Sequence, residues 1–304
     1  MANASNIETP MPGTPKTGTP RPETLMEIEN LCVTYGRGAS AMQAVRNVSF
    51  RLGRERLGIV GESGSGKSTI GRALLKLLPT ATITADRMDF EGTDLLGASE
   101  RRMLKVRGAR ISMILQDPKF SLNPVQRVGD QIAEAYAVHH RGKRREARLK
   151  ALAMLEAVQI RDPERVYQLY PHEISGGMGQ RVMIAMMLVP EPDVIIADEP
   201  TSALDVTVRM KVLGILDDLV RERGLGLIMI SHDLNLVRNF CDRVLIMYSG
   251  QVVEALPASE LGNARHDYTR GLLAAQPRIG GDRSPLPVLR RDESWKRPLA
   301  EVNA

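Results

Sequence analysis

Residues 61–69, Gly-Glu-Ser-Gly-Ser-Gly-Lys-Ser-Thr, constrain the fold more than any other stretch of this chain. Two glycines separated by four residues and followed by Lys67 and Ser68 form the pattern of a phosphate-binding loop. The apolar run 57–60 predicts a buried strand before the loop, and 70–78 predict a helix that ends before a proline. A strand, a glycine loop and a helix are the context that this pattern requires, so a chance glycine-rich turn is the weaker interpretation.

The residue types in this loop have a physical reason. Glycines let the backbone curl so that successive N–H groups face inward, and the helix N-terminus adds partial positive charge. Lys67 can reach the β- and γ-phosphates of a nucleotide, and Ser68 can offer its hydroxyl to Mg²⁺. The expected nucleotide contacts in this loop are Gly61, Ser63, Gly64, Ser65, Gly66, Lys67, Ser68 and Thr69.

Composition and charge narrow the function classes. Cys32 and Cys241 are the only cysteines among 304 residues, which argues against a disulfide framework or a cysteine-ligated metal and favours a reducing compartment. No apolar run approaches the roughly 20 residues needed to cross a bilayer, and we expect no secretory signal. The net charge is +5, with basic clusters at 101–110 and 139–148. Apolar residues interrupt both clusters at helical spacing, so we interpret them as solvated helix faces rather than a nucleic-acid or anionic-lipid surface.

Changes in composition and in the periodicity of apolar residues along the chain indicate its organisation. Residues 1–24 are rich in Thr and Pro and predict a disordered tail. Residues 26–31 and 45–52 alternate apolar and polar side chains, as strands of an antiparallel sheet do. Strand 111–115 is followed by helical periodicity, which predicts an inserted α-helical subdomain at about 117–188. We expect one unit over 25–256 and an extension over 257–304.

Two further features supply polar groups. Asp198 and Glu199 follow the continuously apolar run 194–197, which predicts a strand buried on both faces. A parallel strand beside the phosphate loop would place Asp198 near Mg²⁺ and Glu199 near the γ-phosphate, where Glu199 could polarise water as a general base. Ser175, Gly176 and Gly177 open a predicted helix and make either a simple N-cap or a second anion site.

These features, in this order and spacing, resemble the nucleotide-binding subunit of an ABC transporter over about residues 27–254. The resemblance implies an α/β fold: a P-loop NTPase core of ABC type with an antiparallel β subdomain and an inserted α-helical subdomain. It also implies an ATP hydrolase that uses ATP and Mg²⁺. Each reaction centre would be composite, because the phosphate loop of one chain meets the Ser-Gly-Gly helix of another.

The same resemblance implies roles for single residues. Tyr35, otherwise a hairpin tyrosine, matches the aromatic that stacks on adenine. Gln116 matches the glutamine that touches Mg²⁺ and the attacking water and couples to the membrane subunit. Asp205 matches the loop that crosses the dimer interface, and His232 the histidine that holds the γ-phosphate and the catalytic carboxylate. The expected catalytic residues are Glu199, His232 and Gln116; the expected metal contacts are Ser68, Gln116 and Asp198; Ser175, Gly176, Gly177, Tyr35 and Asp205 complete the nucleotide site.

A narrower resemblance is to the dipeptide, oligopeptide and nickel importer ATPases. It is carried by residues 116–118, 121–124 and 266–273, with Asp267 in place of the usual proline. Many members of that family hold an iron–sulfur cluster in a cysteine-rich C-terminal segment, but no cysteine follows Cys241, so no iron–sulfur cluster is expected.

The resemblance implies a peripheral ATPase subunit at the cytoplasmic face of a bacterial inner membrane, taking up di- or oligopeptides or a related small solute. Its partners would be a second ATPase subunit of the same or a sister chain, two transmembrane permeases and, indirectly, an extracytoplasmic solute-binding protein. The alternatives are a soluble ABC ATPase acting on nucleic acid and an exporter ATPase. A single cassette without a long insertion argues against the first, so no nucleic-acid partner is expected. The segment 266–273 argues against the second.

Overall fold

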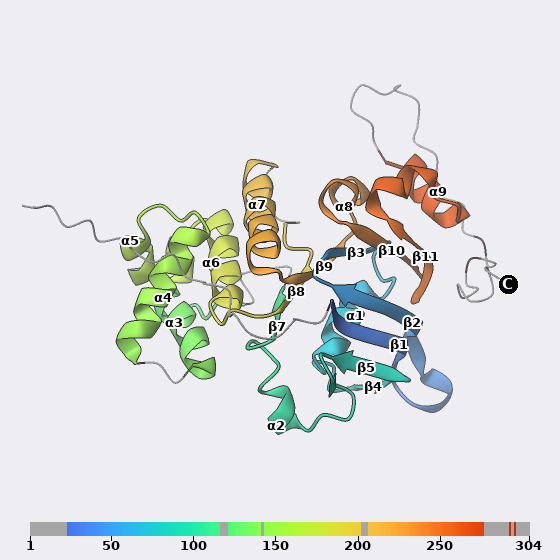
Figure 1. Cartoon of the computed structure of the whole chain (residues 1–304), viewed down its shortest axis with the longest axis horizontal. Coiled ribbons are helices and arrows are strands. Elements are labelled where there is room, and N and C mark those ends of the chain that lie inside the picture. Colours follow the sequence, from blue (N-terminus) through green and yellow to red (C-terminus); the bar gives the residue numbers. More distant parts are fainter. Residues whose placement is uncertain are drawn as a thin grey trace, which may run out of the picture.

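The computed structural model describes residues 23–115, 121–140, 143–201 and 206–276, together with 292 and 295. Two β-sheets lie beside a lobe of helices, and the C-terminal helix lies against the end of the larger sheet (Figure 1). None of the helices within these ranges is both long and apolar enough to span a bilayer. This arrangement confirms the fold class expected from the sequence.

The smaller sheet is antiparallel. Its strands are β1 (Thr24–Tyr35), β2 (Met42–Gly53), β4 (Ala81–Thr84), β5 (Arg87–Phe90) and β6 (Thr93–Asp94). The order is β2-β1-β5-β6, with β4 also paired to β1. Both predicted strands in this region are longer than their alternating patterns, because β1 and β2 pair along almost their whole length and bulges absorb the register shifts.

The larger sheet carries the phosphate loop. Its strands are β3 (Arg56–Gly61), β7 (Ile111–Ile114), β8 (Val194–Asp198), β9 (Gly226–Ser231), β10 (Arg243–Tyr248) and β11 (Gln251–Pro257), in the order β11-β10-β3-β9-β8-β7. All neighbours are parallel except β10 and β11. The strand that ends at Asp198 is parallel to the phosphate-loop strand, as expected, and β9 lies between them. Sequence order cannot show this, because strands of a parallel sheet need not be neighbours in the chain.

Nine α-helices complete the described part of the chain: α1 (Lys67–Leu74), α2 (Glu100–Met103), α3 (Val128–His139), α4 (Arg144–Ala157), α5 (Pro163–Gln168), α6 (Gly176–Leu188), α7 (Val206–Arg223), α8 (Leu234–Phe240) and α9 (Asp267–Ala274). Helices α3 to α6 pack on one another as the helical lobe (Figure 1).

The larger sheet is buried on both faces. Ile195 and Ala197 of β8 pack into the core shared with the helical lobe, whereas Val194 and Ile196 pack into the core shared with α1 and the smaller sheet. Side chains alternate across a strand, so a continuously apolar run serves two cores at once. The two cores hold the carboxyl ends of the strands in one rigid edge.

Helix α1 ends at Leu74, four residues earlier than its periodicity predicts. Lys76 takes a left-handed conformation with φ 51°, and the Leu77 N–H donates to the Arg72 carbonyl at 2.8 Å. This is a Schellman-type end, for which glycine is the usual signal. The Lys76 ammonium also donates to the carbonyls of Leu96 and Ala98, both at 2.9 Å, so tertiary contacts hold a lysine in this conformation.

Candidate nucleotide and magnesium site

Two glycines of the phosphate loop are required by close backbone approach. A Cβ on Gly61 would lie 2.2 Å from the Met247 carbonyl oxygen, and one on Gly66 would lie 2.5 Å from that of Ala44. Gly66 also has φ 98°. The Ser65 carbonyl accepts a hydrogen bond from the Gly250 N–H at 3.0 Å. The β10–β11 turn and β2 therefore support the loop from outside.

Lys67 begins α1 directly after the loop and is 6% exposed. Its ammonium donates to the carbonyls of Gly61 at 2.8 Å and Glu62 at 2.7 Å. Burial lowers the pKa of Lys67, while the carboxylates of Glu199 and Asp198 act in the opposite direction. The cation thus rests on weak neutral acceptors inside the loop, where a phosphate would be a much stronger partner.

Ser68 of α1 and Asp198 of β8 are in contact, although β8 is not a neighbour of β3, the strand that leads into α1. The Ser68 hydroxyl donates to Asp198 Oδ1 at 2.7 Å. Asp198 is 3% exposed, and burial raises its pKa, with the Ser68 hydrogen bond opposing the shift. A hydroxyl and a carboxylate fit Mg²⁺, which prefers hard oxygen donors and is usually held by one or two protein groups plus substrate phosphates. Among the described residues no cluster of three or more His, Cys, Asp or Glu side chains could hold a metal by itself.

Glu199 and His232 are brought together from the ends of β8 and β9. The His232 imidazole hydrogen bonds to Glu199 Oε1 through Nδ1, at 2.9 Å. Glu199 has φ 49°, and its N–H donates to the Ile230 carbonyl at 2.9 Å. A left-handed glutamate is an unfavourable conformation that neighbouring structure must hold. Its side chain remains 19% exposed, so a water molecule can reach the carboxylate.

The Ser-Gly-Gly segment belongs to the other lobe. Ser175 caps α6 by accepting a hydrogen bond from the Met178 N–H at 3.3 Å, and both Ser175 and Gly176 are exposed. A Cβ on Gly177 would meet Val208 of α7. Helix α6 lies in the helical lobe, whereas α1 lies beside the sheets (Figure 1). The chain therefore presents its two helix N-termini on separate parts of the molecule.

Three further site residues were expected from the sequence. Tyr35 ends β1, paired with Met42 and Ala81, and is half-buried. Gln116 and Asp205 lie outside the described residues.

The sequence did not single out Gln180, which supports the candidate site through a buried hydrogen bond. It is 1% exposed within α6, and its Nε2 donates to the Pro200 carbonyl at 2.7 Å. This hydrogen bond joins the Ser175 helix to the segment that carries Glu199. The available signal was a glutamine on a helix otherwise rich in apolar residues, because a buried amide requires a partner.

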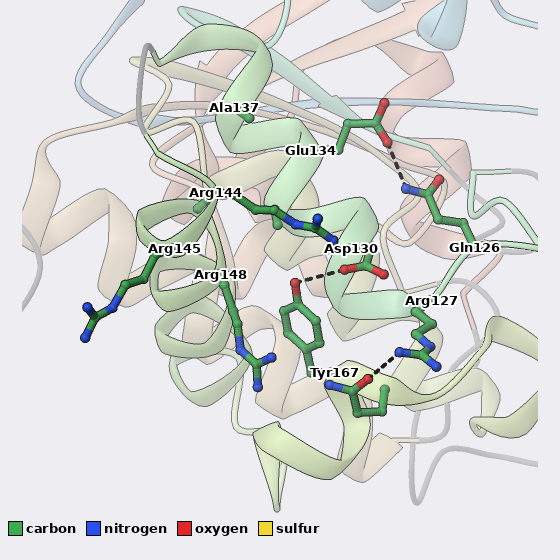
Figure 2. A pocket seen from close by; sticks show the side chains of 12 residues that line it. Gln126, Arg127, Asp130, Glu134, Ala137, Arg144, Arg145, Arg148 and Tyr167 are labelled. Atoms are coloured by element: carbon green, nitrogen blue, oxygen red, sulfur yellow. Dashed lines mark hydrogen bonds between the residues drawn. The ribbon is translucent and has the colours of Figure 1, made fainter.

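The helical lobe also contains an open cleft of about 920 Å³ between α3, α4 and α5. Figure 2 shows arginines around it, including Arg144, Arg145 and Arg148 of α4. Its acidic lining groups have partners: Asp130 accepts from the Tyr167 hydroxyl at 3.1 Å, and Glu134 from Gln126 at 2.9 Å. Val125, which directly precedes the lining residue Gln126, is 81% exposed. The cleft suits an acidic partner with some apolar surface.

Comparisons with known proteins agree with this geometry. The family model described as ABC transporter matches residues 45–202. A probable peptide ABC transporter ATP-binding protein of Sinorhizobium fredii is 46% identical over 89% of this chain and 82% of the relative. The oligopeptide transport ATP-binding protein OppD of Bacillus subtilis is 45% identical over 84% of this chain and 72% of the relative.

Among solved structures, the dimeric post-hydrolysis state of the ATP-binding cassette MJ0796, bound to ADP and Pi, matches with a TM-score of 0.69 and 27% identity. That match covers 77% of this chain and 99% of the other. In this chain, a glycine-rich loop, a serine–aspartate pair and a glutamate bonded to a histidine lie within a fold that matches this cassette. The chain belongs to the ABC transporter family, as an ATP-binding subunit that hydrolyses ATP.

Proposed function

We propose that this ATPase powers a bacterial importer of di- or oligopeptides or a related small solute. The names of its relatives support this, since they include peptide, oligopeptide and dipeptide transport ATP-binding proteins. The C-terminal segment 266–273, which resembles that importer class, folds as α9 against the core.

The hydrogen bond between His232 and Glu199 carries the proposal for catalysis. Glu199 is the general base for water, and His232 orients its carboxylate and responds to the γ-phosphate. Lys67 moves from the loop carbonyls to the phosphates. Ser68 and Asp198 would hold Mg²⁺, which neutralises charge developing on the β- and γ-phosphates when bound. We assign Gln116 to the same metal and water, and Tyr35 to adenine stacking.

The remaining nucleotide contacts are proposed to come from a second ATPase subunit. Ser175 and Gly176 are exposed, and Gly177 is half-buried, at a capped helix start, where an anion-binding surface for a partner's nucleotide must be accessible. Asp205 would lie across the same interface. ATP then joins two positively polarised helix ends, and loss of phosphate after hydrolysis releases them.

The membrane partners are proposed to be two permeases, supplied with solute by an extracytoplasmic binding protein. The loop 121–127 comes soon after Gln116 in the chain, and its last two residues, Gln126 and Arg127, line the arginine-rich cleft. The buried Gln131 amide holds the Asn123 backbone of this loop at 2.8 and 3.0 Å. We assign this cleft to an acidic cytoplasmic helix of a permease. The subunit would accordingly sit at the cytoplasmic face of the inner membrane, with 25–256 as the ATPase unit and 257–304 as an extension.

The test uses a strain whose own copy is deleted and replaced by the wild type, Glu199→Gln or the exposed control Glu222→Gln. Glu199→Gln should lower ATP turnover by about 100-fold or more and abolish uptake of labelled peptide, because a general base contributes about 10²–10⁴-fold. ATP binding should persist. Wild-type chain with a photo-crosslinker at Ala137, in the cleft, should label a permease.

The outcomes separate the parts of the proposal. Normal turnover by Glu199→Gln would rule out this carboxylate as the base. Unchanged peptide uptake in the deletion strain, with normal ATPase activity of the purified wild type, would rule out peptide import while leaving the ATPase assignment intact.

A further inference from the structure

A tyrosine from the C-terminal extension reaches the phosphate loop. Tyr268, the second residue of α9, is fully buried, and its hydroxyl accepts a hydrogen bond from the Glu62 N–H at 3.0 Å. The two residues are 206 positions apart in the chain. Glu62 is the second residue of the loop, next to Gly61.

The peptide unit between Gly61 and Glu62 is consequently held at both ends. Its carbonyl oxygen accepts from the Lys67 ammonium at 2.8 Å, while its N–H donates to Tyr268. The loop can bind phosphate only if its peptide planes keep fixed orientations. When Lys67 turns to a phosphate, its hydrogen bond to the Gly61 carbonyl is given up, and the Tyr268 hydroxyl still fixes this plane.

The tyrosine is itself held firmly. Its ring lies 4.6 Å from that of Tyr248 and 5.7 Å from that of Trp295, centroid to centroid. Its own N–H donates to His266 Nδ1 at 3.2 Å, which caps α9. Glu254 of β11 accepts a hydrogen bond from the Arg265 N–H at 2.7 Å, which holds the segment before α9 against the larger sheet. Aromatic pairs at these separations restrain one another beyond simple area burial.

We infer that Tyr268 is a positioning residue for ATP binding, acting through the Gly61–Glu62 peptide to fix the backbone of the phosphate loop. The C-terminal extension thereby becomes part of the nucleotide site without touching nucleotide. The inference rests on the ATPase activity of the family and not on the proposed solute, so failure of peptide uptake would leave it intact.

Tyr268→Phe in the full chain removes the hydroxyl and keeps the ring. The ATP dissociation constant and the KM should rise about tenfold, equivalent to about 1.4 kcal/mol, with kcat changed less than about threefold. The effect falls on KM because the backbone of the phosphate loop contacts the phosphates in the ground state as well as in the transition state. The matched control is Tyr248→Phe, in the same aromatic cluster, whose hydroxyl has no hydrogen bond in the described part of the structure.

Hydrogen exchange of the loop amides gives a readout that packing alone would not move. The Glu62 amide should be protected in the wild type and in Tyr248→Phe, and lose protection in Tyr268→Phe. An unchanged KM in Tyr268→Phe, or an equal rise in Tyr248→Phe, would overturn the inference. If Tyr268→Phe fails to fold, hydrogen exchange of the wild type still tests the inference. Rapid exchange of the Glu62 amide in the wild type would contradict its hydrogen bond to Tyr268.

Discussion

Several residues of the candidate nucleotide site are buried charges or have unfavourable backbone conformations. Asp198 is a carboxylate with almost no exposure, and Glu199 adopts a left-handed backbone conformation. Lys67 is a buried cation resting on carbonyls. Strained or desolvated groups of this kind persist where function needs them, and they cost free energy of folding.

Replacing Asp198 should reveal this cost. Burial raises the pKa of Asp198 above its ordinary 3.8, so its contribution is favourable below pH 3.8 and is lost as the pH rises through the folded-state pKa. Asp198→Asn keeps an acceptor for Ser68 and removes the charge. The free energy of unfolding at pH 7.5 should therefore rise by about 1 kcal/mol, or about 2–4 °C in Tm.

Thermal unfolding without nucleotide or metal measures this effect, and the gain should vanish as the pH falls toward 3.8. Asp218→Asn, on the exposed face of α7, is the control and should change little. Destabilisation by Asp198→Asn at pH 7.5 would show that attraction to Arg72 and Lys67 outweighs desolvation.

At the scale of elements, α6 is joined to the segment that follows β8. Gln180 of α6 hydrogen bonds to Pro200, directly after Glu199. Ser175 caps one end of α6, and Gln180 within the helix contacts the segment that carries Glu199, the proposed general base. Movement of one lobe is thus tied to the position of Glu199.

Gln180→Met should lower the free energy of unfolding by about 1–3 kcal/mol, because it leaves the buried Pro200 carbonyl without its donor. Gln168→Met is the matched control: Gln168 is exposed and accepts from Arg127 at 2.7 Å, so a change within about 0.5 kcal/mol is expected. Denaturant unfolding measures both. Equal effects of the two substitutions would mean that the Pro200 contact contributes nothing specific.

At the scale of the molecule, one chain presents the phosphate loop and the Ser175 helix on different lobes (Figure 1). The solved cassette MJ0796, which this fold matches, is dimeric. A composite site predicts that each chain is complete only when another covers it.

Ser175→Arg should leave ATP binding to a single chain unchanged and abolish ATP-dependent dimerisation in a Glu199→Gln background. Light scattering with size separation measures the dimer. Mixing Ser175→Arg with Lys67→Ala chains should restore part of the ATPase activity that each lacks alone, since one intact site can form between them. No recovery on mixing, with a strictly monomeric and active wild type, would contradict the composite site.

The sequence by itself determined the phosphate loop, the buried strands and the amphipathic helices, because the residue types that form them are local in the chain. It also supplied Asp198, Glu199 and His232 as candidates. Only the tertiary structure decided that β9 separates β3 from β8, that Lys76 rather than glycine ends α1, and that Gln180 and Tyr268 support the site. Strand order and a buried partner depend on contacts between distant residues, which periodicity in the sequence does not encode.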